Sequence, residues 1–303
     1  MKSRAEKFGS IYTPMTIGEY KLYTVQTGLI RLDGGAMFGV VPKPLWSKTN
    51  PSDDRNRIDM CMRSLLLVSD KKKILIDNGV GYKLPEKLND IYGVDHSKYT
   101  LEHELEALGY KREDITDVIL THLHFDHAGG STDFDTEYRA RISFPNATYH
   151  LQRKHWDWGQ NPSERDKASF IPENYNPIKE AGHLKLYDGD TKFDEFIDLN
   201  IVSGHTPHMQ LVTIKDNSTT LLYNADLFPT TTHLNLAYIM GYDLFPLTTL
   251  DEKKKYLPKI IKEKWLLFFE HDAYTETCRV EMGEKGVVAV DKSELSKRQN
   301  NEQ

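Results

Sequence analysis

The stretch THLHFDHAGG, residues 121–130, places three histidines and one aspartate within six positions, directly after the apolar run DVIL. An apolar run that gives way at once to polar side chains predicts a buried strand followed by a loop. Imidazole nitrogen and carboxylate oxygen are the donors that zinc and similar ions take where thiolates are absent. The stretch therefore predicts a metal site at the end of a buried strand.

The spacing of these donors indicates two metal ions. In an extended segment, side chains two residues apart point the same way, so His122 and His124 can reach one ion. Asp126 continues that spacing, and His127 turns to the other side. A single histidine is more often a core or surface residue, but four donors in six residues favour metal binding.

The composition limits the class of protein and its partners. The chain has 303 residues, a formal charge of -6 and two cysteines. An acidic balance argues against a nucleic-acid partner, which needs a clustered positive field. We see no apolar run long enough for a transmembrane helix and no secretory signal, so we expect a cytoplasmic protein without membrane contact. Cys61 and Cys278 are predicted to be buried thiols rather than a disulfide framework.

Apolar periodicity and turn signals predict the elements around the motif. Strands are expected within residues 21–35 (two short strands), 61–79 (strand, turn, strand), 117–120, 147–152, 210–226 and 265–272. Helices are expected at residues 100–109, capped by Thr100 and ended by Gly109, and at 249–264, with a Thr249–Glu252 capping box and a kink or break at Pro258. Residues 36–54 are expected to form a loop.

The domain organisation follows from the absence of a low-complexity linker. We expect one domain over residues 1–303, with an N-terminal lead at 1–18 and a polar C-terminal tail at about 288–303. Residues 210–226 repeat the plan of residues 63–79, because each segment has a strand, a polar turn, a second strand and an aspartate near its end. This echo is a weak sign of duplicated architecture.

The motif THLHFDH matches the His-x-His-x-Asp-His signature of the metallo-β-lactamase superfamily, and the chain resembles that family from about residue 22 to residue 272. The later ligand stations appear in the right order, as SGHTPHMQ supplies His205, LLYNAD supplies Asp226 and FFEHD supplies His271. The resemblance implies an α/β fold, an αββα sandwich of two mixed β-sheets flanked by helices. It also implies that the site lies at one edge of the sandwich.

The resemblance further implies a role for each ligand. His122, His124 and His205 would hold the first ion, Asp126, His127 and His271 the second, and Asp226 would bridge two Zn²⁺ or other divalent transition-metal ions. A hydroxide held between the ions is expected to be the nucleophile, with Asp126 and Asp226 as catalytic residues and Asp126 as a proton carrier. Asp77 is expected to orient a ligand histidine, and His208 to form part of the wall. The remaining histidines outside the motif, His96, His103, His150, His155 and His183, are expected to be structural or solvated.

Longer segments resemble the quorum-quenching N-acyl-homoserine lactonases. These are LDGGAMFGVVPKPLWSK at residues 32–48, Phe125 inside the motif, and NADLFPT at residues 224–230. This resemblance implies a small-molecule partner, a lactone whose ring is opened to the hydroxy acid. The residues expected to contact it are Met37, Phe38, Trp46, Phe125 and His233. The apolar loop at residues 36–46 is also a candidate contact in a homodimer.

One residue departs from the lactonase pattern. Many such lactonases place a tyrosine three residues after the bridging aspartate, where this chain has Pro229. Tyr223, His233, Tyr238 or another donor could take that role. The departure keeps organophosphate hydrolases and arylesterases of the same superfamily as the alternative. Glyoxalase II-type thioesterases, nucleases, class B β-lactamases and a purely structural metal protein rank lower.

Overall fold

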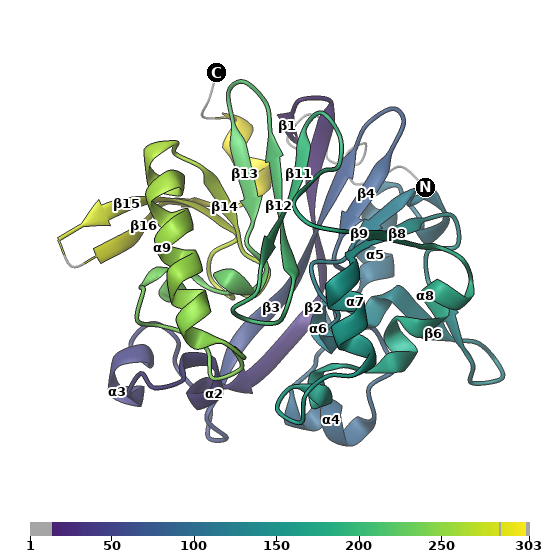
Figure 1. Cartoon of the computed structure of the whole chain (residues 1–303), viewed down its shortest axis with the longest axis horizontal. Coiled ribbons are helices and arrows are strands. Elements are labelled where there is room, and N and C mark those ends of the chain that lie inside the picture. Colours follow the sequence, from purple (N-terminus) through teal and green to yellow (C-terminus); the bar gives the residue numbers. More distant parts are fainter. Residues whose placement is uncertain (1–13, 285, 301–303) are drawn as a thin grey trace.

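The computed structural model describes residues 14–284 and 286–300. Two β-sheets lie face to face, with helices on their outer faces (Figure 1). The expected αββα sandwich is therefore confirmed. No helix within the described ranges is long and apolar enough to cross a membrane.

The first sheet has seven strands in the order β1-β2-β3-β4-β5-β8-β9. They are β1 (Met15–Ile17), β2 (Tyr20–Asp33), β3 (Arg57–Val68), β4 (Lys73–Ile76), β5 (Asp117–Ile119), β8 (Thr148–Gln152) and β9 (Leu184–Tyr187). From β1 to β4 the neighbours are antiparallel, whereas β4, β5, β8 and β9 are parallel. The carboxyl ends of β4 and β5 therefore lie at the same edge of this sheet.

The second sheet also has seven strands, in the order β10-β11-β12-β13-β14-β15-β16. They are β10 (Thr191–Lys192), β11 (Ile197–Val202), β12 (Met209–Lys215), β13 (Thr220–Tyr223), β14 (Leu266–Phe268), β15 (Thr277–Gly283) and β16 (Gly286–Ser293). The hairpins β3–β4 and β12–β13 are each followed by a parallel neighbour, β5 and β14. This shared plan accounts for the echo in the sequence.

The helices and a small hairpin complete the chain. The helices are α2 (Gly34–Phe38), α3 (Lys43–Trp46), α4 (Glu86–Ile91), α5 (Leu101–Leu108), α6 (Phe125–Ala128), α7 (Arg153–Gln160), α8 (Asn176–Glu180) and α9 (Pro246–Lys262), and the hairpin is β6 (Thr132–Phe134) with β7 (Ala140–Ile142). One apolar core lies between the sheets and extends to Tyr256, Leu257 and Ile260 of α9. A second core lies between the first sheet and helices α5, α7 and α8.

Helix α5 forms where it was predicted, with the predicted ends. The Thr100 side chain accepts a hydrogen bond from the backbone N–H of His103, and Gly109 takes the left-handed conformation at φ 88°. A left-handed residue after a helix favours glycine because it has no Cβ.

Three predicted elements differ from the structure. Residues 21–33 belong to one long strand, β2, with an irregularity between Gln26 and Gly28, and not to two short strands, and residues 34 and 35 begin α2. The predicted loop at 36–54 contains α3 and the end of α2. Helix α9 starts at Pro246, which suits a first helical position, and continues through Pro258. The Thr249–Glu252 capping box is wrong, because Glu252 accepts hydrogen bonds from the backbone N–H groups of Ser203 and Gly204 at 2.6 and 3.1 Å.

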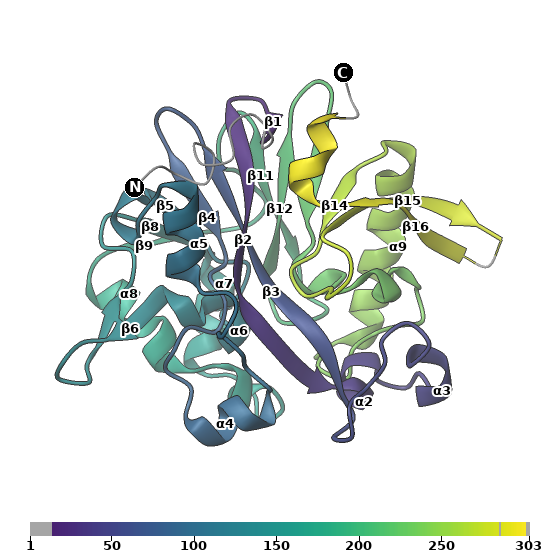
Figure 2. The same ribbon diagram turned by 180° about the vertical axis from the view of Figure 1, so that it is seen from behind.

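Both ends of the chain contribute more structure than predicted. Residues 1–13 of the expected lead and 301–303 of the expected tail lie outside the described residues, but strand β1 within the lead pairs with β2. The expected polar tail forms β16 and the 3₁₀ helix η7 (Leu295–Asn300), which lies against β1 and β2 (Figure 2). Leu295 is 1% exposed and belongs to the core between the sheets.

Shortening this side chain tests the packing of the C-terminal segment. We expect Leu295→Ala to lower the free energy of unfolding by about 2–5 kcal/mol, the usual loss for a buried leucine. Urea denaturation measures the change. Leu247→Ala is the control, since Leu247 is 75% exposed and should shift stability by less than about 0.5 kcal/mol. Equal small effects of the two substitutions would contradict the packing of Leu295.

Candidate metal centre

Strand ends bring the predicted ligands together. His122 and His124 follow β5, and α6 contributes Asp126 and His127. From the second sheet, the β11–β12 turn contributes His205, and Asp226 and His271 follow the parallel strands β13 and β14. The seven side chains fall into two groups of buried donors.

The first group contains His122, His124, His205 and Asp226, whose donor atoms all lie within 4.8 Å of one another. The Asp226 Oδ2 atom is 3.1 Å from His205 Nε2 and 3.9 Å from His122 Nε2. His205 Nε2 is also 3.1 Å from His124 Nδ1. This set offers three imidazole nitrogens and one carboxylate to a single point.

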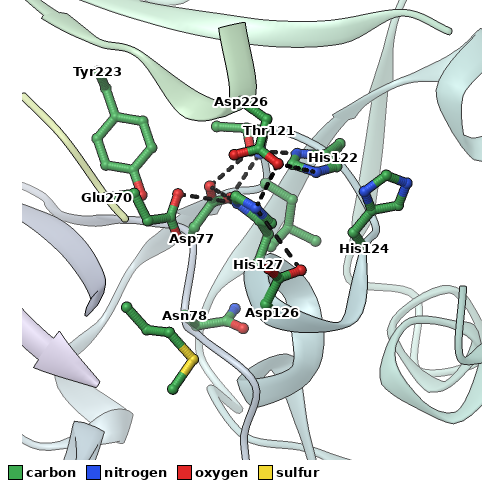
Figure 3. Close-up of polar contacts among 12 residues, drawn as sticks. Asp77, Asn78, Thr121, His122, His124, Asp126, His127, Tyr223, Asp226 and Glu270 are labelled. Atoms are coloured by element: carbon green, nitrogen blue, oxygen red, sulfur yellow. Dashed lines mark hydrogen bonds and ion pairs between the residues drawn. The ribbon is translucent and has the colours of Figure 1, made fainter. Parts of the chain in front are cut away.

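The second group contains Asp126, His127 and His271, again with donor atoms within 4.8 Å of one another. Asp226 faces this group as well, because its Oδ1 is 3.3 Å from His271 Nε2 and its Oδ2 is 3.5 Å from His127 Nε2. Among the described residues, Asp226 is thus the one carboxylate that contacts histidines of both groups. Figure 3 shows it between His122 of the first group and His127 of the second.

Hydrogen bonds, and an ion-pair contact between His127 and Glu270, orient the imidazole rings of the candidate ligands. His127 Nδ1 faces Glu270 Oε2 at 3.0 Å and Asp77 Oδ2 at 3.2 Å. His205 Nδ1 faces Asp243 Oδ1 at 2.8 Å, and His271 Nδ1 faces the Cys61 carbonyl at 3.0 Å. His122 Nδ1 faces Thr121 Oγ1 at 2.9 Å. The Thr121 hydroxyl itself donates to Asp77 Oδ2 at 2.7 Å. Because these partners accept from an Nδ1–H, we assign the proton to Nδ1, which leaves the Nε2 lone pair for the centre.

The sequence analysis identified only Asp77 among these supporting residues. Thr121 and Glu270 directly precede the ligands His122 and His271 in the sequence, so adjacency was an available signal. Asp243 lies 38 positions from His205, and no local pattern connects the two.

The buried donors fit a divalent cation. With Nδ1 protonated on both rings, His127 Nε2 and His271 Nε2 present lone pairs to each other at 3.1 Å, which is unfavourable without a positive charge between them. His122 Nε2, His124 Nε2 and Asp226 Oδ1 are also buried without a hydrogen-bond partner among the described residues. Buried polar atoms rarely stay unpaired, so their arrangement supports ion binding.

The charges of the buried carboxylates also favour a cation at these donors. Burial alone would lower the pKa of His271, but the carboxylates of Asp226 and Glu270 raise it to about 9. Burial, reinforced by His127 and His124, holds the pKa of His122 well below its usual value. The carboxylates therefore attract positive charge to the centre, and a bound metal would displace the histidine protons.

The other histidines lie outside the two donor groups. His208 contributes no donor atom to either group, its backbone N–H bonds the Ser203 hydroxyl, and its φ is +56°. His155 has a structural role that the sequence analysis did not specify. Its Nε2 accepts from the backbone N–H of Leu123 at 2.8 Å, and its Nδ1 lies 2.7 Å from the Pro207 carbonyl. His155 thus ties the motif loop to the His205 turn.

A cavity of about 170 Å³ opens on the donors. Its wall includes the ligands His124, Asp126, His205, Asp226 and His271, the apolar side chains Leu32, Met37, Met60, Phe125 and Met240, the tyrosines Tyr92 and Tyr242, and the polar residues Arg165, Asp166 and Ser169. The wall of the cavity therefore combines apolar and aromatic side chains with the candidate metal donors.

The predicted pocket residues divide into two layers. Met37 and Phe125 line the cavity, whereas Phe38, Trp46 and His233 do not. Phe38 stacks between Trp46 and His233 at ring distances of 5.2 and 4.7 Å, and His233 Nε2 lies 2.8 Å from the Met37 carbonyl. Phe38, Trp46 and His233 therefore pack behind the cavity wall and do not line it.

Residues 235–243 connect the cavity wall to the metal donors. The segment supplies Met240 and Tyr242 to the wall and Asp243 to His205. Lys253 of α9 lies beneath it, 1% exposed, and its ammonium group donates to the carbonyls of Tyr238 at 2.6 Å and Asn235 at 3.3 Å. Burial lowers the pKa of Lys253 to about 7.

Comparisons with known proteins agree with this architecture. The family model described as Metallo-beta-lactamase superfamily matches residues 63–268. An N-acyl homoserine lactonase of Bacillus sp. is 26% identical over 277 residues, which cover 86% of this chain and 96% of that protein. The crystal structure of a probable metal-dependent hydrolase from Staphylococcus aureus has a TM-score of 0.82 at 29% identity, over 92% of this chain and 100% of that chain. The structure of AidC, a dizinc quorum-quenching lactonase in complex with the product N-hexanoyl-L-homoserine, has a TM-score of 0.78 at 24% identity, over 93% of this chain and 98% of that chain.

Removing a supporting carboxylate should weaken metal binding. We expect Asp243→Ala to lower zinc affinity about 10- to 100-fold, because His205 loses the acceptor that orients its ring. Competition with a chromophoric chelator measures the affinity. Asp243→Asn, which keeps an oxygen acceptor, should lose less, and His208→Ala should keep full metal content. Unchanged affinity in Asp243→Ala would contradict the role of this hydrogen bond.

Lys253 should make stability depend on pH in the alkaline range. Its pKa is about 7 in the folded protein and 10.5 in the reference state, so between these values the unfolded chain binds more protons. Stability of the wild type relative to Lys253→Met should therefore rise with pH from 7 to 10, by at most about 1.4 kcal/mol per pH unit. Urea denaturation of both proteins at several pH values measures the difference. A difference that stays constant or falls would contradict the lowered pKa.

Proposed function

Because this chain belongs to the metallo-β-lactamase superfamily, we propose that it is a dinuclear metal hydrolase that opens the lactone ring of N-acyl-homoserine lactones. The proposal rests on Asp226, whose two oxygens face histidines of both donor groups at 3.1–3.5 Å, at the wall of a partly apolar cavity. A carboxylate shared between two sets of histidines supports two ions, and the cavity gives a substrate access to both.

The donor set suits nitrogen- and oxygen-preferring ions. His122, His124 and His205 would hold one ion, Asp126, His127 and His271 the other, and Asp226 both. Such ions, when bound, supply Lewis acidity and a water that is acidic enough to react at neutral pH. Zinc, manganese, iron and cobalt all accept these donors, and the two buried cysteines belong to neither group.

The chain's own residues supply proton transfer and binding. Ring opening adds one water and breaks the bond between the lactone carbonyl carbon and the ring oxygen. The carbonyl carbon gains a hydroxyl group, and the departing ring oxygen must take a proton. The Asp126 carboxylate lines the cavity and lies 3.8–3.9 Å from the nearest nitrogens of His271 and His127. We assign it the transfer of that proton.

The cavity favours a small lactone with an apolar substituent. Its volume of about 170 Å³ is below the 300–1,000 Å³ usual for drug-sized ligands. Leu32, Met37 and Met240 offer the apolar wall that a short acyl chain needs. The lactonase of Bacillus sp. that shares 26% identity over most of the chain supports the same substrate class.

Rates on three ester classes test the proposal. For the zinc-loaded protein we expect kcat/KM above about 10⁴ M⁻¹s⁻¹ on N-hexanoyl-homoserine lactone, which is within the range of enzymes on their own substrates. Proton release measures the reaction. Paraoxon and phenyl acetate are run in parallel, because Pro229 leaves the alternative of an organophosphate hydrolase or arylesterase. A higher kcat/KM on either compound would contradict the lactonase assignment.

Substitution of Asp226, the carboxylate that faces both donor groups, tests the two-metal arrangement. Asp226→Ala should lower turnover by at least about 100-fold with only partial loss of metal, because each donor group keeps its three other ligands. His208→Ala serves as control and should keep its activity, since His208 belongs to neither group. Full activity in Asp226→Ala would contradict the two-metal arrangement.

A further inference from the structure

Two tyrosine hydroxyls in the cavity have no partner in the protein. Tyr92 and Tyr242 line the same cavity as Asp126 and Asp226, and neither hydroxyl makes a hydrogen bond to another described residue. Tyr82, which is 42% exposed against 36% for Tyr242, does pair its hydroxyl, which donates to Glu102 Oε2 at 2.6 Å. Two unpaired donors beside the metal ligands indicate a subsite for substrate oxygen.

The structure holds both tyrosines in place. The Tyr92 ring stacks on Phe125 at 4.8 Å with an interplanar angle of 20°, and the Tyr92 carbonyl accepts from the backbone N–H of Arg31 at 2.7 Å. Tyr242 follows Gly241, whose N–H donates to the Ala36 carbonyl at 2.7 Å. A donor on a fixed backbone loses little freedom when it binds a substrate.

Tyr92 and Tyr242 share the cavity wall with Asp126 and His271 of the second donor group. Burial first, and then the nearby charge of Asp126, raises the pKa of Tyr92. Burial, Tyr92, Asp33 and Asp126 raise the pKa of Tyr242. Both phenols therefore stay protonated at neutral pH and remain hydrogen-bond donors.

The donors that the sequence analysis named for this role are occupied or lie outside the cavity wall. Tyr223 donates to the Arg63 carbonyl at 3.1 Å. Both His233 nitrogens face partners, the Thr230 hydroxyl and the Met37 carbonyl, each at 2.8 Å. Tyr238 packs edge-on against Phe38, outside the cavity wall. Pro229 has no donor at all.

We propose that the hydroxyls of Tyr92 and Tyr242 donate hydrogen bonds to the oxygens of the ester that is cleaved, and so orient it against the metal donors. The proposal rests on the proposed hydrolase function. It assigns substrate orientation to residues of the α4 end and of segment 235–243, which are far from Pro229 in the sequence.

Removing one oxygen atom at a time tests the proposal. We expect Tyr92→Phe and Tyr242→Phe each to lower kcat/KM about 10- to 100-fold, with zinc content and melting temperature at wild-type values. Tyr238→Phe is the matched control and should keep wild-type rates, because its ring lies outside the cavity. Rates are measured on whichever of the lactone, phenyl acetate and paraoxon the wild type cleaves fastest. Rates within twofold of wild type in both variants, or losses that follow a loss of zinc or of folding, would overturn the proposal.

A binding measurement separates this inference from the choice of substrate. Calorimetry with N-hexanoyl-L-homoserine, the ring-opened product, on the zinc-loaded proteins should give an affinity about tenfold weaker in each Phe variant. Cleavage of none of the three esters by the wild type would overturn the proposed function. The tyrosine assignment would still be decided by this affinity. Equal product affinity in wild type and variants, or no binding to the wild type, would overturn it.

Discussion

The placement of the buried carboxylate of Asp226 among histidines from both sheets is the interaction on which the rest of the site depends. Burial would raise the pKa of Asp226, but the charges of His127, His205 and His271 hold it well below its usual value. A carboxylate is stable at this depth only when positive charge surrounds it. The sandwich provides that charge, because the ends of parallel strands in each sheet bring the donors to one point.

The hydrogen bonds around the donors join the two sheets at this point. The Cys61 N–H of β3 donates to the His271 carbonyl, and the His271 ring donates back to the Cys61 carbonyl. The Arg63 N–H donates to the Glu270 carbonyl in the same way. His271, a proposed metal ligand, is therefore held by its own backbone as well as by its ring.

Much of the fold, and the clustering of the donors proposed as metal ligands, could be predicted from the sequence, because both depend on local signals. The ligands stand at the ends of short apolar runs, so DVIL, LLY and LLF mark where a strand stops and a donor follows. Asp243 and Lys253 escaped prediction because they act on residues distant in the chain, His205 and the 235–238 carbonyls. The capping box failed for a similar reason, since tertiary hydrogen bonds from Ser203 and Gly204 occupy Glu252. Two of the five predicted pocket residues line the cavity, because apolar content does not distinguish a ring that lines a cavity from one that packs behind it, as Phe38 does.

Residues 235–243 couple the shape of the cavity wall to the support of His205. The segment carries Tyr242 on the cavity wall and, one residue later, Asp243 behind His205. Substitutions that reshape the wall there are expected to disturb the hydrogen bond between Asp243 and His205, a proposed metal ligand. Selection for new substrates through this segment is thus coupled to selection for metal retention. Variation at Leu32, which lines the same cavity from the long strand β2, is freer of that coupling and offers the more permissive route to altered specificity.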